Sequence, residues 1–200
     1  MTIAPSATAT SRDGLLPLLV GLWGAGAFAA SALGFTSAIA RVSAPAYGLV
    51  IAATIALPVA LYLAWPPLAR RLDAIPLRSL TLFHVPRVAG GVLFLVYGWL
   101  GLLPPVFAIL LGFGDIIAAA AAAAVLPDDA SPTAMRLGHL TGLADFAIGL
   151  TCGMTLGLLG DTRLVPIAEL PLSQIVLWWV GMLATTHVVA LVRLGRGERA

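Results

Sequence analysis

The sequence has very little charge for its length. Only 10% of its 200 residues are Asp, Glu, Lys or Arg, whereas a soluble globular domain carries about 25%. So few ions cannot cover the surface of a soluble fold, so the composition excludes a soluble globular enzyme. Disorder is excluded as well, because 60% of the residues are hydrophobic and a chain this apolar does not stay solvated without folding.

Lysine is missing and cysteine is nearly so. The single cysteine, Cys152, excludes a disulfide framework and every multi-cysteine metal site. All eleven basic residues are arginines dispersed along the chain, without the clustering that nucleic-acid phosphates require. We therefore expect no nucleic-acid partner. No nucleotide-binding loop, zinc motif or activated nucleophile stands out either, and the sequence leans against an enzyme.

Long uncharged runs are what the sequence does contain. A helix needs about 20 apolar residues to cross the hydrocarbon core of a bilayer, and the runs between charges reach that length. The pattern predicts an all-α bundle of six transmembrane helices in one domain, 15–194, between a flexible polar leader, 1–14, and a short basic tail, 195–200. The spans are expected near 15–38, 45–68, 80–103, 105–126, 135–159 and 172–194.

The arginines predict how the bundle sits in the lipid bilayer. An even number of spans places both termini on one side, and eight arginines fall on that side. Only Arg41 and Arg163 fall on the other side. This asymmetry is the one described by the positive-inside rule. We therefore expect both termini to be cytoplasmic.

Three charges remain inside the predicted spans: Arg87, Asp115 and Asp145. Ionisable groups within a bilayer are costly and mark functional sites by default. Counting the helical rise from the span ends puts both aspartates near the midplane. Each follows a glycine by three positions, Gly112 and Gly142, which predicts thin helix walls around the carboxylates.

Two interpretations of Arg87 are open from the sequence. Arg87 lies about 10 Å from the cytoplasmic end of its span, so its side chain can reach either aspartate. A desolvated contact would hold that partner ionised and leave the other carboxylate able to carry a proton. Alternatively, Pro86 begins the helix, and Arg87 extends to the cytoplasmic interface.

The three histidines, His84, His139 and His187, all fall on the cytoplasmic half of the predicted bundle. Coming from three different helices, they could ligate a metal ion or provide axial ligands to a haem. No spacing motif supports this, and hydrogen-bonded packing histidines are the ordinary interpretation. We therefore predict no cofactor, with haem or a metal ion as the alternative.

Small residues recur on faces of the predicted helices. In a bilayer such residues allow helix backbones to approach closely, because lipid supplies no hydrophobic drive for association. The contacts can lie within the chain or between copies. We accordingly expect a homo-oligomer or a subunit of a membrane complex. The helix-packing candidates are Gly26, Ala30, Gly34, Gly112 and Gly142.

A resemblance rests on residues 84–122, which read HVPRVAGGVLFLVYGWLGLLPPVFAILLGFGDIIAAAAA. This stretch resembles small, uncharacterised bacterial membrane proteins in which an Arg–Gly helix, a Leu-Pro turn and a Gly-Asp-Ile helix follow one another. A later helix with Asp, like Asp145, and a last helix with His then Arg, like 187–193, belong to the same pattern. The resemblance implies a six-helix membrane fold and no activity. We expect the protein to be located in a bacterial cytoplasmic (inner) membrane.

The sequence favours proton-linked translocation of a small solute or ion as the function. Its basis is the predicted group of Arg87, Asp115 and Asp145 at mid-depth. A non-catalytic assembly or scaffold subunit, in which these charges pair with one another or with a partner chain, is the first alternative. A haem- or metal-binding redox subunit that uses the histidines is the second.

Overall fold

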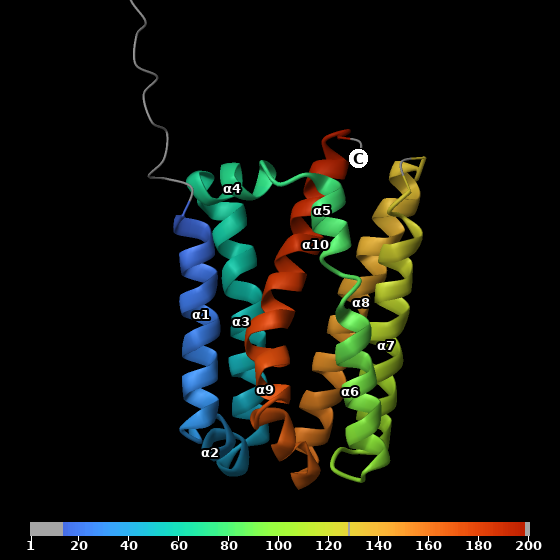
Figure 1. Cartoon of the computed structure of the whole chain (residues 1–200). Helices are drawn as coiled ribbons and strands as arrows, with labels where there is room; N and C mark the ends of the chain where they lie inside the picture. Colours follow the sequence, from blue (N-terminus) through green and yellow to red (C-terminus); the bar gives the residue numbers. More distant parts are fainter. Residues whose placement is uncertain (1–13, 128, 199–200) are drawn as a thin grey trace, which may run out of the picture.

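The computed structural model describes residues 14–127 and 129–198, which form an elongated bundle of helices (Figure 1). The predicted leader thus lies almost wholly outside the described residues, as does the end of the predicted tail. The described residues contain helices and turns and no strand. The all-helical fold class is therefore confirmed.

Six helical segments are long and apolar enough to cross a membrane, as the sequence predicts, and they are compatible with a multi-pass membrane protein. α1 begins at the end of the bundle where α10 ends (Figure 1). That this end faces the cytoplasm remains a prediction. The segments are Leu15–Ala32 (α1), Ala44–Ala64 (α3), Leu77–Trp99 (α5 and α6), Pro105–Ala124 (α7), Pro132–Leu158 (α8) and Leu172–Gly195 (α9, η2 and α10).

The first two spans are shorter than predicted. α1 ends at Ala32, and Gly34 turns the chain with a φ of 78° into the short helix Phe35–Val42 (α2). Glycine adopts this left-handed conformation without strain, so Gly34 serves a turn. α3 ends at Ala64, because the next residue, Trp65, precedes a proline and is extended. Pro66 then begins the helix Pro66–Asp73 (α4), which lies across the end of the bundle (Figure 1).

The third span, predicted near 80–103, is broken just before Arg87. Leu77–Leu82 (α5) and Arg87–Trp99 (α6) are separated by four turn residues. Pro86 lacks an amide hydrogen and disfavours a continuous helix. Short-range bonds bridge the break, from the Arg87 amide to the His84 carbonyl (3.2 Å) and from the Ala89 amide to the Pro86 carbonyl (3.0 Å). As a result, α6 begins inside the bundle.

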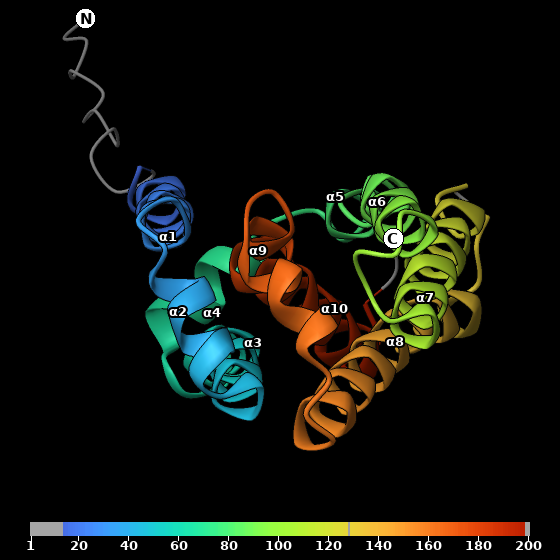
Figure 2. The same cartoon turned by 90° about the horizontal axis from the view of Figure 1, so that it is seen from below.

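The last span is irregular at its start. A 3₁₀ segment, Thr162–Ala168 (η1), leads into Leu172–Gln174 (α9), a π-helical turn at Ile175–Trp179 (η2) and Val180–Gly195 (α10). Within an 18-residue apolar stretch of the last span 56% of the residues are buried, whereas in α1 only 6% are. The last span is therefore the central helix of the bundle, between α3 and α8 (Figure 2).

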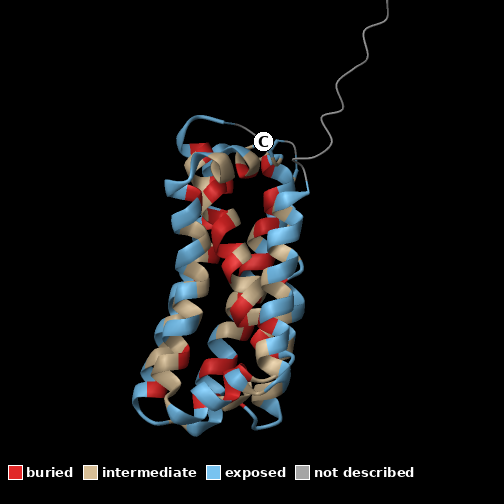
Figure 3. Ribbon diagram, turned by 90° about the vertical axis from the view of Figure 1, so that its left-hand side faces the viewer, coloured by how far each residue is buried: buried red, intermediate tan, exposed pale blue. Residues whose placement is uncertain are grey.

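Burial follows the inside of the bundle along its whole length (Figure 3). Large apolar side chains cover much of the outside, among them Leu22, Leu49 and Ile117, which are all exposed. A contiguous apolar outer surface of this kind marks contact with lipid or with other proteins. The described polar groups therefore concentrate at the ends and in the interior.

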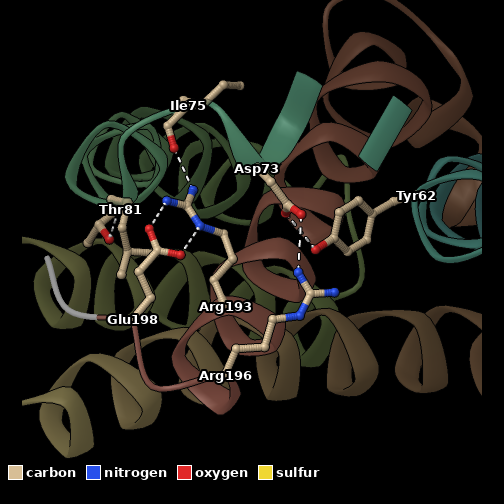
Figure 4. A network of polar contacts seen from close by, with 8 residues as sticks. Tyr62, Asp73, Ile75, Thr81, Arg193, Arg196 and Glu198 are labelled. Carbon is tan, nitrogen blue, oxygen red and sulfur yellow. Dashed lines mark hydrogen bonds and ion pairs between the residues drawn. The ribbon is translucent and has the colours of Figure 1, made fainter. Parts of the chain in front are cut away.

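A network of charged side chains closes the bundle where α4, α5 and α10 meet (Figure 4). Arg193, near the end of α10, is buried and donates to the Ile75 carbonyl and to both carboxylate oxygens of Glu198. Arg196 donates to Asp73 at 3.1 Å. The hydrogen bond from Arg193 lowers the pKa of the Glu198 carboxyl below its ordinary value.

Candidate functional site

Arg87 is buried in the centre of the bundle. It is the first residue of α6, and only 2% of its surface is exposed. Of the two interpretations open from the sequence, the start of the helix at Pro86 holds, but the extension to the interface does not. α5 continues the third span toward the bundle end, which leaves the start of α6, and with it Arg87, in the interior.

The guanidinium of Arg87 uses each of its three nitrogens on a different helix. Nε donates to Asp115 Oδ1 of α7 at 2.8 Å, and Nη2 donates to Asp145 Oδ2 of α8. Nη1 contacts Nε2 of His187 in α10 at 3.2 Å. The Cζ atom lies 4.2 Å from the centroid of the Phe146 ring, a cation–π contact. Arg87 thus joins α6 to three neighbouring helices.

Glycines give this cluster its space. A Cβ atom at Gly142 would overlap the His187 ring and crowd Arg87 Nη1, and one at Gly114 would overlap the Asp145 carboxylate. A Cβ at Gly112 would press into Leu95 of α6. The thin walls expected beside the two aspartates are therefore places where neighbouring helices approach closely.

The two other packing candidates lie in α1, away from the cluster. A Cβ at Gly26 would meet no described atom within 4 Å. Ala30 belongs to the same poorly buried helix. α1 packs weakly within the described chain. Contact of the face of α1 that carries Gly26 and Ala30 with another copy of the chain stays a prediction.

The charges of the cluster do not balance. One guanidinium faces two carboxylates, whose side chains are only 12% and 10% exposed. If both aspartates are ionised, the group keeps a surplus negative charge in an environment where an unpaired charge is costly. A proton or a bound cation is therefore needed to neutralise it.

The three histidines meet on the other side of Arg87, and each is at most 2% exposed. His139 and His187 are joined through their Nδ1 atoms at 2.9 Å. The His84 ring stacks on His187 with 3.6 Å between centroids. His84 Nε2 contacts the Thr186 hydroxyl at 3.2 Å, whereas its buried Nδ1 has no hydrogen-bond partner among the described residues.

Arg87 determines which histidine nitrogens carry protons. An arginine only donates, so His187 Nε2 accepts and the His187 proton is on Nδ1. That proton is donated to His139 Nδ1, which leaves the His139 proton on Nε2, facing the Thr81 hydroxyl at 3.2 Å. Thr81 in turn donates to the Leu77 carbonyl at 3.0 Å. All these bonds therefore donate in one direction, away from Arg87.

This arrangement fits neither a metal ion nor a haem. One ring nitrogen of each histidine lies within 4.8 Å of the others, which is the donor count of a three-histidine zinc site. A metal on His187 Nδ1, however, would move the proton to Nε2, where it would face the donor Nη1 of Arg87. A porphyrin has no room between rings that stack directly. The redox alternative therefore loses its structural basis.

An apolar cavity of about 90 Å³ lies on the opposite side of the two carboxylates. Both aspartates line it, and it extends to Ala40 in α2 and Ile167 in η1, toward the lower end of the bundle in Figure 1. Its aromatic walls are Tyr47, Phe94, Phe107 and Phe146.

A second cavity, of about 350 Å³, lies between α6 and the start of the last span. Arg87, Gly90 and Trp178 line it together with Asp115, which lines the first cavity as well. The nearby Gln174 Nε2 is buried without a hydrogen-bond partner among the described residues. Asp115 is therefore reached from two sides.

Two contributors to the site were missed from the sequence. Phe146 directly follows Asp145, and an aromatic beside an intramembrane acid was a usable signal. Thr81 gave none, because its contact with His139 joins residues 58 positions apart. Neither residue belongs to a recognisable motif.

Comparison with known proteins identifies a family for most of the chain. Residues 44–195 match the model of a family described as a domain of unknown function (DUF8737), a range that contains Arg87, both aspartates and the three histidines. No curated protein and no solved structure matches the chain. Because the matched range covers most of the sequence, the chain belongs to this family.

Proposed function

We propose that this protein moves a small solute or ion across a membrane in a proton-linked manner, with Arg87, Asp115 and Asp145 as the site. The observation that carries the proposal is the sharing of one guanidinium by two carboxylates beside a cavity. The surplus negative charge is neutralised either by a proton or by a cation. A site that binds the two in alternation couples their movements, because each lowers the affinity for the other.

The interrupted third span supports a transport role. Irregular backbone at membrane depth is tolerated where it is buried in protein or lines a cavity, and transporters place their sites at such interruptions. Here the break between α5 and α6 places Arg87 beside both aspartates. Pro86 and Arg87 also line the second cavity.

The histidine chain supplies a route for protons on the side away from the cavity. It runs from His187 through His139 to Thr81. Arginine does not give up its proton in proteins, so Arg87 separates this chain from the carboxylates while it stays in place. Transfer between the two sides therefore requires Arg87 to leave His187 during the cycle.

The test measures proton flux in proteoliposomes under an imposed pH gradient. The double variant Asp115→Asn with Asp145→Asn should abolish the flux, because neither residue can then release a proton. Asp161→Asn is the matched control: this acid lies outside the spans, and its bond from Arg163 lowers its pKa. Undiminished flux in the double variant would overturn the proposal.

An assembly role is the second candidate, because the contacts of Arg87 join four helices. In that case the charges specify packing and carry no flux. Replacing the whole ionic group by Arg87→Gln, Asp115→Asn and Asp145→Asn should then weaken the oligomer or complex. Wild-type protein without measurable flux in proteoliposomes would favour this candidate over translocation.

A further inference from the structure

We propose that the cavity beside Asp115 and Asp145 binds a small alkylammonium ion, with its ammonium group on the carboxylates and its alkyl group among the aromatic walls. This inference identifies the solute of the proposed function. It rests on that function in one respect, which concerns the proton. The ammonium ion and the proton must compete for the same surplus negative charge.

The lining of the cavity selects an organic cation. Besides the two aspartates, Tyr47 has the only hydroxyl on the described wall, and it donates to the Ile167 carbonyl at 3.4 Å. Ca²⁺ and Mg²⁺ take about six oxygen ligands or more, which these groups do not supply. Anions are repelled by the carboxylates, and a neutral apolar ligand would make no use of them.

The carboxylates keep acceptor capacity for an ammonium group. Arg87 occupies Oδ1 of Asp115 and Oδ2 of Asp145, which leaves one oxygen on each that Arg87 does not bind. An alkylammonium ion offers three N–H donors. It therefore matches the cluster in charge and in hydrogen-bonding capacity.

The aromatic walls suit the rest of such a ligand. Cations are attracted to aromatic faces, and the Phe146 ring already lies against the Arg87 guanidinium. Phe94 and Phe107 pack edge to face, with 6.2 Å between their centroids. Methylene groups next to an ammonium carry part of its positive charge, so they gain from these rings as well as from burial.

The volume limits the length of the alkyl group. An apolar cavity of about 150 Å³ holds benzene, with its six heavy atoms. A cavity of about 90 Å³ accordingly takes about four heavy atoms by the same measure. Propylammonium, with one nitrogen and three carbons, is therefore the best-matched probe.

The experiment is calorimetric titration of the purified full-length protein with propylammonium, with 1-propanol as the uncharged analogue. We expect one site for the amine, none for the alcohol, and binding at least tenfold weaker at pH 5 than at pH 8. Asp115→Asn with Asp145→Asn should abolish binding, and Asp161→Asn should leave it unchanged. Equal binding of 1-propanol, or undiminished binding of the amine in the double variant, would overturn the inference.

A second variant keeps the test valid if loss of the carboxylates disturbs folding. Ile51→Phe adds volume to the cavity wall and leaves the ionic cluster in place, so it should reduce amine binding at least tenfold. Unchanged binding would contradict the proposed location. Proton flux without amine binding would remove this inference alone, whereas amine binding without flux would remove the proposed function alone.

Discussion

The two sides of Arg87 differ in what they can accommodate. On one side, two carboxylates share a guanidinium beside an apolar cavity, so there is both surplus charge and space. On the other side, His84 stacks on His187 and His187 is hydrogen-bonded to His139, so the three imidazoles lie so close together that only a proton can move among them. A single residue therefore separates a region suited to a ligand from one suited only to protons.

The largest effect should follow removal of the residue that both sides share. Arg87→Gln leaves two buried carboxylates without their cation, and breaking a buried ion pair costs about 3–5 kcal/mol. Denaturant unfolding in detergent micelles would measure the loss. The neutral triple variant with Asp115→Asn and Asp145→Asn should recover most of it, since no charge is then left unpaired. A triple variant as unstable as the single one would show that Arg87 acts through packing alone.

A glycine substitution on each side tests the difference in space. Gly142→Ala places a methyl group against His187 and Arg87, and overpacking costs about 1–3 kcal/mol. Gly149→Ala on the cavity side has the Leu111 side chain as its nearest neighbour, at 3.2 Å, and should cost less. Thermal unfolding would rank the two variants.

The nitrogen NMR signals of the histidines distinguish Gly142→Ala from Gly149→Ala. His187 Nε2 should be unprotonated in the wild type and should change its signal in Gly142→Ala but not in Gly149→Ala. A wild-type His187 protonated on Nε2 would contradict the donation order away from Arg87.

The smallest effect is expected from an ion pair that lies on neither side of Arg87. Arg193 lowers the pKa of Glu198, which lies outside the spans. The contribution of this ion pair to the free energy of unfolding is therefore fully present at a pH above the ordinary glutamate pKa of about 4.5. It is lost as the pH falls through the lowered pKa of Glu198. Glu198→Gln should flatten this part of the stability–pH curve slightly. A large change would mean that the end of α10 is coupled to the buried cluster.

The number of spans and the three buried charges could be predicted from the sequence. Long uncharged runs define helices that need lipid, and charges within them are rare enough to be conspicuous. The sequence left open whether the third span is interrupted at Pro86, and the structure shows that it is. That interruption also decides the position of Arg87, which counting residues along a straight helix left open.

The meeting of the histidines could not be predicted. His139 and His187 are 48 positions apart and lie on different helices, so no spacing along the chain records their contact. The cavity was hidden for the same reason, since its walls come from six helices, α2, α3, α6, α7, α8 and α10, and from the two segments η1 and η2. Such features depend on how helices pack, and a single sequence carries that information only indirectly.

The π-helical turn at Ile175–Trp179 fixes the rotational register of everything that follows it. A π turn accommodates one residue more than an α-helical turn, and one residue corresponds to about 100° around a helix axis. The turn therefore sets the angle at which α10 presents His187 and Arg193. Losing one residue there would leave every contacting side chain in the sequence and yet rotate His187 away from Arg87. The site therefore requires the additional residue of the π turn as well as His187 itself.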